Sequence, residues 1–372
     1  MKVIAWYLPQ FHEIKENNEF WGKGFTEWTN MKKAKPLFTN HFQPRVPLNK
    51  NYYDLSDWRV LCNQASIAKR YGVYGFSIYH YWFDKRILLN KPLENLLSHT
   101  EIDINYCICW ANESWTNSWV SNSKTVLIKQ NYGDEKEWRE HFEYLCQFFK
   151  DKRYIKEDGC PLLVIYRPEK TGIMERMVKL WKMMAVDAGF NGLKVAYQHA
   201  MFSTSSCDKS YFDYGIEYQP MYALNDLQSK SERLISALKE RFSVIFQDIF
   251  GTSPSLKRSN VITYNYDKVW RAVLDRHGEE KESIIPGAFV DWDNTPRRGS
   301  KGTVFLGASP QKFEKYMIEQ IRNARINYKS DLLFIFAWNE WAEGGYLEPD
   351  EKNEYSYLKA LYRALETCDE LP

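Results

Sequence analysis

The chain has 372 residues, enough to bury a complete hydrophobic core. Its formal net charge is +2 with both signs spread along the sequence, so the charge pattern indicates neither a nucleic-acid partner nor an acidic docking tail. Aromatic residues make up 16% of the chain and include 14 Trp. Flat rings with polar edges match the faces and rims of sugars, so this content favours a carbohydrate-binding cleft.

Cysteine usage and the start of the chain bear on the compartment. The seven cysteines lack C-x-x-C spacing, so we expect reduced thiols and no disulfide framework. The apolar run at residues 2–8 is too short for a signal peptide, and no run approaches the roughly 20 residues of a membrane span. We therefore expect a soluble cytoplasmic protein without a membrane span, and we infer no obligate protein partner.

Short apolar or aromatic runs recur along the chain and predict buried strands, because they are rich in β-formers and bounded by Gly, Pro, Asn or Asp. These runs are residues 3–8, 73–79, 104–110, 162–166, 193–198, 214–219, 285–290 and 332–337. Segments with helical spacing lie between most of them, at residues 57–71, 135–149, 172–188, 231–249, 267–276, 311–328 and 355–366. Ser309 and Pro310 supply a helix N-cap and a first-turn proline for the segment 311–328.

Strands that alternate with helices predict an α/β fold, a single (β/α)8 TIM barrel formed by residues 1–372 as one domain. The long intervals 11–54 and 221–283 predict loop insertions after strands 1 and 6 that cover the barrel mouth. An open doubly wound sheet is the alternative. It is disfavoured because Pro9-Gln10-Phe11-His12 stands where a Gly-rich phosphate turn would follow the first strand.

The segment Trp338-Asn339-Glu340-Trp341-Ala342-Glu343-Gly344-Gly345 follows the last predicted strand and carries the clearest chemical signal. Cleavage of a glycosidic bond needs one carboxyl group as an acid and a second as a base or nucleophile. A helical turn after the strand would place Glu340 and Glu343 roughly 5–6 Å apart on one face. That distance overlaps the separation of about 5–5.5 Å typical of enzymes that retain anomeric configuration. We predict that Glu340 and Glu343 are the catalytic residues.

Polar and aromatic residues also gather at the ends of the other predicted strands, where TIM barrels carry their chemistry. From these ends we predict a set of substrate-binding residues. The set is Tyr7, His80, Tyr81, Trp82, Trp110, Asn112, Glu113, Tyr218, Trp292, Asn294, Arg297, Asn339 and Trp341.

Some of these residues have alternative interpretations. His80 could be a near-core histidine, and Arg297-Arg298 could be a solvated turn or a clamp for an acidic or phosphate-bearing substrate. Glu113 follows Asn112 at a strand end, where many retaining barrel enzymes carry their acid/base, and its role stays open. No residue cluster has metal-ligand spacing, and no P-loop or G-x-S-x-G elbow occurs, so we predict no metal and no cofactor.

Long motifs in the chain resemble the WbsX-like proteins of bacterial polysaccharide gene clusters, including those of O-antigen and lipopolysaccharide biosynthesis, over nearly the whole sequence. The family in turn is similar to glycoside hydrolase family 99, the endo-α-mannosidases. The motifs are Tyr7-Leu8-Pro9-Gln10-Phe11-His12, Trp21-Gly22-Lys23-Gly24-Phe25-Thr26-Glu27-Trp28-Thr29, His41-Phe42-Gln43-Pro44, Tyr53-Asp54-Leu55, Tyr79-His80-Tyr81-Trp82-Phe83, Trp110-Ala111-Asn112-Glu113 and Asn339-Glu340-Trp341-Ala342-Glu343-Gly344.

The resemblance implies a metal-free, family 99-like (β/α)8 catalytic domain that acts on a glycan. Carried over residue by residue, it makes Glu340 the base towards the sugar 2-hydroxyl, which gives an anhydro-sugar intermediate, and Glu343 the acid/base at the leaving oxygen. The sequence departs from family 99 at Ala342, where that family has His, and from the usual WbsX-like pattern at Gly345-Tyr346, where Ala-His is common.

Three functions follow as hypotheses. The first is a retaining glycoside hydrolase acting on a surface polysaccharide or its precursor. The second is a glycosyltransferase or transglycosylase of the same pathway, although the chain has no nucleotide-binding feature that would indicate a sugar-nucleotide donor. The third is a non-catalytic glycan-binding barrel, which the Glu340/Glu343 pair disfavours.

Overall fold

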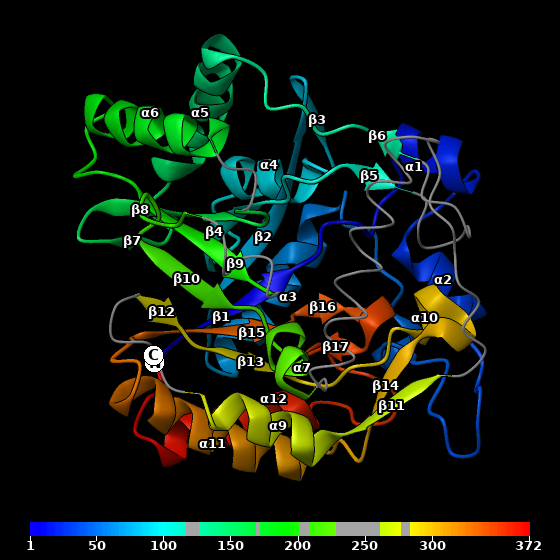
Figure 1. Cartoon of the computed structure of the whole chain (residues 1–372). Coiled ribbons are helices and arrows are strands. Elements are labelled where there is room, and N and C mark those ends of the chain that lie inside the picture. Colours follow the sequence, from blue (N-terminus) through cyan, green and yellow to red (C-terminus); the bar gives the residue numbers. More distant parts are fainter. Residues whose placement is uncertain (117–125, 169–171, 201–207, 228–260, 277–282) are drawn as a thin grey trace.

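A parallel sheet curled into a nearly closed barrel forms the centre of the computed structural model, which describes residues 1–116, 126–168, 172–200, 208–227, 261–276 and 283–372 (Figure 1). The order of the strands is β12-β10-β9-β8-β4-β2-β1-β15-β13, and neighbours pair in parallel. The predicted TIM-barrel-like fold is confirmed. The alternative prediction, an open doubly wound sheet, is not confirmed. The barrel strands are β1 (Lys2–Tyr7), β2 (Val73–Phe83), β4 (Asn105–Trp110), β8 (Cys160–Ile165), β9 (Lys194–His199), β10 (Tyr214–Glu217), β12 (Ile284–Ile285), β13 (Gly287–Phe289) and β15 (Leu332–Phe336).

The seventh predicted strand is split in two, and the split closes the barrel. β12 pairs with β10 on one side, whereas β13 pairs with β15 on the other. Pro286 separates the two pieces. Proline has no N–H to donate to a neighbouring strand, but its carbonyl oxygen still accepts a hydrogen bond of 3.1 Å from the backbone N–H of Phe334. The two ends of the strand order therefore meet at one proline.

Gly287 begins β13 and lies against the backbone of Glu217 at the end of β10. A Cβ atom at this position would be 1.9 Å from the backbone oxygen of Glu217. We expect Gly287→Ala to lower the free energy of unfolding by about 3 kcal/mol, measured by urea denaturation, because backbone would have to move. Gly189→Ala is the control. A Cβ there has open space and only the positive φ costs energy, about 1 kcal/mol. Equal losses in the two variants would contradict a steric role for Gly287.

Amphipathic helices surround the barrel and match most predicted segments, while the predicted helix at 231–249 lies outside the described residues. The N-cap expected at Ser309 is confirmed, because its side chain accepts a hydrogen bond from the backbone of Lys312. The helices between the barrel strands and at the end of the chain are α3 (Trp58–Arg70), α4 (Lys91–Ser98), α5 (Glu135–Phe149), α6 (Ile173–Asp187), α9 (Tyr266–Leu274), α11 (Pro310–Ile326) and α12 (Ser356–Thr367).

Aromatic rings fill the barrel interior. Trp6 on β1 lies 5.9 Å from Tyr79 on β2, 5.0 Å from Phe334 on β15 and 5.6 Å from Tyr218, measured between ring centroids. Tyr218 follows β10, which is far from β1 in the strand order, so this contact crosses the barrel. At this level the interior is therefore filled by side chains, as is usual in TIM barrels.

Short elements gather beyond the carboxyl ends of the strands, on the right of Figure 1. The loop after β1 contains α1 (Lys15–Trp21), α2 (Glu27–Lys33) and the 3₁₀ helix η1 (Leu48–Lys50), and the interval after β10 contains α7 (Met221–Leu227) and β11 (Ile262–Asn265). Within the described ranges, no helix combines the length and apolar content needed to cross a bilayer. The remaining short elements are β3 (Arg86–Leu88), β5 (Trp115–Thr116), β6 (Val126–Ile128), β7 (Lys156–Glu157), α10 (Thr295–Arg298), η3 (Gly299–Lys301), β14 (Thr303–Leu306), β16 (Asn339–Glu340), η4 (Trp341–Glu343) and β17 (Gly345–Tyr346).

Candidate active site

A cleft of about 580 Å³ opens at the carboxyl ends of the strands, within the size range of about 300–1,000 Å³ typical of small-molecule sites. It brings together six of the predicted site residues: Tyr81, Glu113, Tyr218, Arg297, Glu340 and Glu343. The other lining residues are Leu8, Gln10, Asn17, Trp21, Phe25, Glu27, Asn30, Tyr79, Ala111, Ser114, Trp115, Thr116, Val126, Leu127, Tyr166 and Arg298.

The two predicted catalytic glutamates share one arginine. Glu340 ends β16, and Glu343 ends the 3₁₀ turn η4, so the turn predicted between them is present in its tighter form. Arg297 on α10 approaches both carboxylates, with its Nη2 atom 2.7 Å from Oε1 of Glu340 and its Nη1 atom 2.9 Å from Oε1 of Glu343. The Glu340 side chain is 7% exposed and that of Glu343 is 19% exposed, so Glu343 is the more accessible of the two.

Glu27 is a third carboxylate on the same guanidinium, and sequence reasoning did not select it as a site residue. It begins α2, and its Oε2 atom lies 3.0 Å from Nη2 and 3.2 Å from Nε of Arg297. The Arg297 side chain is 3% exposed, and that of Glu27 is 7% exposed. Burial alone would lower the pKa of Arg297, but the charges of Glu27, Glu340 and Glu343 raise it overall. The guanidinium is thus a fixed positive charge enclosed by acids.

Glu340 has an unusually high affinity for a proton. Burial raises its pKa well above the usual value, and the neighbouring charges of Glu343 and Glu27 add to this effect, although Arg297 acts in the opposite direction. A carboxylate with a raised pKa is a stronger base when it is ionised. This environment suits proton abstraction from a sugar hydroxyl.

Aromatic and phenolic side chains form the walls of the cleft. Trp21 and Phe25, from the loop after β1, lie 5.8 Å apart between ring centroids. Further along the chain, Trp115 on β5 packs edge-on against the ring of Tyr81, with 5.4 Å between the ring centroids. Gln10 donates a hydrogen bond of 2.8 Å to the hydroxyl of Tyr81. Half-buried rings beside hydroxyl groups can pack on the apolar faces of sugars.

Glu113 lines the same cleft, in an ion pair with Arg167. The Oε2 atom of Glu113 is 3.2 Å from Nη1 of Arg167, and the Glu113 side chain is 46% exposed. Glu113 thus pairs with Arg167, whereas Glu27, Glu340 and Glu343 pair with Arg297. Its position fits substrate contact and leaves its role open. Across the described residues, no group of His, Cys, Asp and Glu side chains is arranged to hold a metal ion.

Three predicted residues point away from the cleft because side chains alternate along a strand. On β2, Tyr79 and Tyr81 line the cleft, whereas His80 and Trp82 face helix α5. Nε2 of His80 lies 3.0 Å from Nε2 of His141, and Trp82 stacks on the same histidine at 4.3 Å. Burial lowers the pKa of His80 to about 3, so its ring is neutral. Trp110 on β4 packs edge-on against His141 at 4.8 Å. These residues join barrel and helix, so we leave them out of the proposed site.

Three predicted asparagines hold loops in place and do not line the cleft formed by the described residues. Asn339 binds the backbone N–H and C=O of Leu8, at 2.7 and 3.0 Å. Asn112 does the same with the backbone of Arg167, at 2.7 and 2.9 Å. Asn294 accepts a hydrogen bond of 2.7 Å from the backbone N–H of Thr303. Each amide therefore ties a cleft loop to its neighbour.

The remaining predicted residues are buried and are not among the described residues that line the cleft. The hydroxyl of Tyr7 donates to Gln64 at 2.7 Å, and Trp292 packs on Phe336 at 5.4 Å between ring centroids. Trp341 is fully buried between Glu340 and Glu343 in the chain and stacks on Tyr346 at 3.8 Å.

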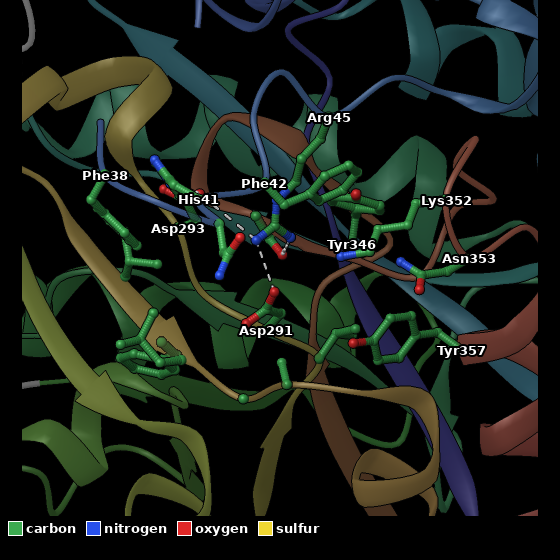
Figure 2. A pocket seen from close by; sticks show the side chains of 18 residues that line it. Phe38, His41, Phe42, Arg45, Asp291, Asp293, Tyr346, Lys352, Asn353 and Tyr357 are labelled. Carbon is green, nitrogen blue, oxygen red and sulfur yellow. Dashed lines mark hydrogen bonds and ion pairs between the residues drawn. The ribbon is translucent and has the colours of Figure 1, made fainter. Parts of the chain in front are cut away.

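A second, smaller cavity of about 150 Å³ is lined by Arg45, Asp291 and Gly344, among other residues (Figure 2). Its charged centre is Arg45, whose Nη2 atom is 2.8 Å from Asp291 and whose Nη1 atom donates to the backbone oxygen of Gly344 at 3.1 Å. The backbone N–H of Asp293 in turn donates to the backbone oxygen of Glu343 at 2.7 Å. This buried cluster therefore fixes the backbone at Glu343 and Gly344.

Asp293 is ionised within this cluster. Burial would raise its pKa, but Arg45 and hydrogen bonds from Thr295, Gln43 and His41 lower it below the usual value. The Thr295 hydroxyl donates to Asp293 at 2.6 Å, and Gln43 donates to it at 2.7 Å. A carboxylate with this many donors keeps a fixed orientation, so it can anchor the turn.

Glu348 is a buried carboxyl group beneath Trp341, and its environment predicts pH-dependent stability. It accepts hydrogen bonds from Trp341 at 2.6 Å, Tyr53 at 2.8 Å and Gln64 at 2.7 Å. Burial still raises its pKa from 4.5 to about 7. A raised carboxyl pKa means that folding favours the protonated form, so this group costs nothing below about pH 4.5, and its cost grows up to about pH 7. The full cost above that pH is roughly 3 kcal/mol.

We expect Glu348→Gln to lack this component of the pH dependence. The free energy of unfolding of the wild-type protein minus that of the variant should fall by roughly 3 kcal/mol between pH 4.5 and pH 8, measured by urea denaturation. Glu351→Gln, at an exposed position on the same loop, is the control and should show no such trend. A difference that stays constant with pH would contradict the assignment to Glu348.

The sequence of this chain is similar to a known family and to curated proteins. A family model described as Glycosyltransferase WbsX matches residues 3–361. The chain is 32% identical over 369 residues to the Uncharacterized protein WxcX from two strains of Xanthomonas campestris pv. campestris, covering 98% of this chain and 49% of that protein. The chain thus spans about half the length of the curated relatives it matches.

Solved structures share the fold. The GH99 endo-α-mannosidase from Bacteroides thetaiotaomicron superposes with a TM-score of 0.54 at 15% identity, covering 99% of this chain and 96% of that one. A structure described as a glycoside hydrolase-like protein gives a TM-score of 0.55 at 12% identity, covering 98% and 93%. At these identities the likeness shows a common fold alone. The family model confirms the resemblance to WbsX-like proteins, and the solved structures confirm a fold shared with a GH99 enzyme.

Proposed function

The chain belongs to the WbsX family, and we propose that it is a retaining glycoside hydrolase acting on a bacterial surface polysaccharide or its precursor. One observation carries the proposal. Glu340 and Glu343 share Arg297 in an aromatic-walled cleft, on a fold that a GH99 endo-α-mannosidase also has. Cleavage of a glycosidic bond needs two carboxyl groups of unlike proton affinity, and here one is buried and the other reaches the solvent side.

In the proposed mechanism, Glu340 takes the proton of the sugar 2-hydroxyl, and the resulting oxygen attacks the anomeric carbon. Glu343 protonates the leaving oxygen at the same time, which gives an anhydro-sugar. In the second step Glu343 takes a proton from water, the water oxygen attacks the anomeric carbon, and Glu340 returns its proton to the 2-oxygen. Two successive inversions retain the anomeric configuration. Arg297 orients both carboxylates throughout.

The test uses purified protein with the surface polysaccharide of its own host and with aryl glycosides and glycosyl fluorides of candidate sugars. The expected result is release of a reducing sugar, with the first-formed anomer matching the substrate when followed by NMR. A product of inverted configuration would contradict the mechanism. Conversion that Glu340→Gln leaves unchanged would contradict the assignment of the site.

Glycosyl transfer is the second candidate, and the description of the family model supports it. A transferase that uses a nucleotide sugar has to neutralise a diphosphate. Among the described residues that line the cleft, the basic ones are Arg297, which three glutamates surround, and Arg298 at the exposed rim. Calorimetric titration with UDP- and GDP-sugars separates the two functions, because micromolar binding would favour transfer.

A further inference from the structure

We propose that Glu27 is a positioning residue that holds part of the positive charge of Arg297 away from Glu340 and so keeps Glu340 a strong base. The inference rests on the proposed role of Glu340. Glu27 approaches Arg297 at the same nitrogen as Glu340 does, since both carboxylates lie within 3.0 Å of Nη2. One donor nitrogen is thus divided between two acids.

The groups that face Glu340 come from four elements. They are Arg297 on α10, Glu343 on η4, Glu27 on α2 and the phenol of Tyr81 on β2. Arg297 alone would stabilise the Glu340 carboxylate and weaken it as a base, because an opposite charge nearby favours the ionised form. Glu27 offsets that effect and also restrains the guanidinium through Nε at 3.2 Å. With Glu27 present, Arg297 can orient Glu340 without suppressing its basicity.

Glu27 does not itself have to touch the substrate for this role. Its side chain is 7% exposed, and its backbone N–H donates to the carbonyl of Gln10 at 3.2 Å, which fixes the start of α2 beside the end of the first strand. Its position is therefore set by the fold before any glycan binds. Substitution by Gln keeps an oxygen that can accept from Arg297 and removes only the charge.

The experiment follows the titration of Glu340 directly, without substrate. Protein labelled with ¹³C at the glutamate carboxyl carbons is titrated by NMR, and the Glu340 resonance is identified by its loss in Glu340→Gln. In Glu27→Gln we expect the Glu340 midpoint to move down by about one pH unit, because a neighbouring negative charge has been removed. Glu27→Asp keeps the charge, so its midpoint should remain closer to that of the wild type.

Glu19→Gln removes the same charge from an exposed position on α1 and should leave the Glu340 midpoint unchanged. An unchanged midpoint in Glu27→Gln would overturn the proposal, as would an equal shift in Glu27→Gln and Glu27→Asp. If Glu27→Gln does not fold, the Glu27→Asp titration decides. If the Glu340 midpoint in Glu27→Asp lies below the wild-type midpoint by less than one pH unit, the proposal is supported. If it lies above the wild-type midpoint, the proposal is overturned. Because the titration uses no substrate, it gives its answer even if no glycosidase activity is found.

Discussion

Glu343→Gln is expected to lower kcat/KM about 1,000-fold on a substrate with an ordinary alcohol leaving group, because loss of a general acid costs this much. The cleavage step should be nearly unaffected with an aryl glycoside or glycosyl fluoride, since such leaving groups depart without a proton. Glu340→Gln should be slow with both kinds of substrate, because assistance at the anomeric carbon is lost in either case. Steady-state and burst kinetics on paired substrates measure the difference.

Glu113→Gln is the matched control for this prediction. Glu113 lines the same cleft but is paired with Arg167 and is 46% exposed. If Glu113 were the leaving-group acid, its variant would recover activity with the activated substrate and Glu343→Gln would not. That pattern would show that Glu113 is the leaving-group acid. Recovery of activity in Glu343→Gln alone supports Glu343 as the leaving-group acid.

Arg297→Met is expected to lower the free energy of unfolding by about 4 kcal/mol at pH 8, because removal of one partner from a buried ion cluster leaves uncompensated charge. Three carboxylates would then face one another without a cation. The loss should shrink towards pH 4.5. Arg297 lowers the pKa of Glu340, so removal of Arg297 raises the pKa of Glu340 in the folded state further. The resulting cost in stability is present above that folded-state pKa and is lost below the pKa of Glu340 in the unfolded chain. Urea denaturation at both pH values checks the effect.

Arg298→Met provides the control, since the neighbouring arginine has an exposed side chain at the rim of the same cleft. Its substitution should change the free energy of unfolding by less than about 0.5 kcal/mol at either pH. A loss in Arg297→Met that is equally large at pH 4.5 and pH 8 would show that the side chain stabilises by packing and not by charge.

The barrel could be predicted from the sequence because each strand is a short apolar run and each helix has a regular face. The split of the seventh strand could not. Residues 285–290 form one apolar run in the sequence. In the structure, Pro286 separates β12 from β13, which pair with different strands, and this pairing depends on barrel closure. Local pattern fixes where strands lie in the chain, whereas their pairing depends on residues far away.

The same distinction between local sequence pattern and distant contacts applies to the residues of the site. Glu340, Glu343 and Arg297 follow strands and were predicted, but Glu27 lies 270 residues before Arg297, in a loop without periodicity. His80 and Trp82 lie in the same polar and aromatic segment as Tyr81, at the end of β2. The alternation of side chains along a strand separates them from Tyr81, and applying it to the sequence would have directed them to the helices.

Packing accounts for one departure from the family pattern. Gly345 stands where Ala is common in WbsX-like proteins, and a Cβ atom there would lie 2.2 Å from the ring of Phe336. Tyr346 in place of His stacks on Trp341 and donates to Asp350 at 2.7 Å. In this chain, both positions are therefore set by packing around Phe336 and Trp341.

The loop after β1 supplies both Trp21 and Phe25 on the cleft wall and Glu27 on Arg297. Under the proposed function, contacts to the sugar and the charge around Glu340 and Glu343 therefore both come from residues 21–27. An exchange of this loop between relatives, made to change which glycan is accepted, would also exchange the segment that positions Glu27 on Arg297. Engineering of specificity in this scaffold should graft the aromatic positions singly and leave Glu27 in place.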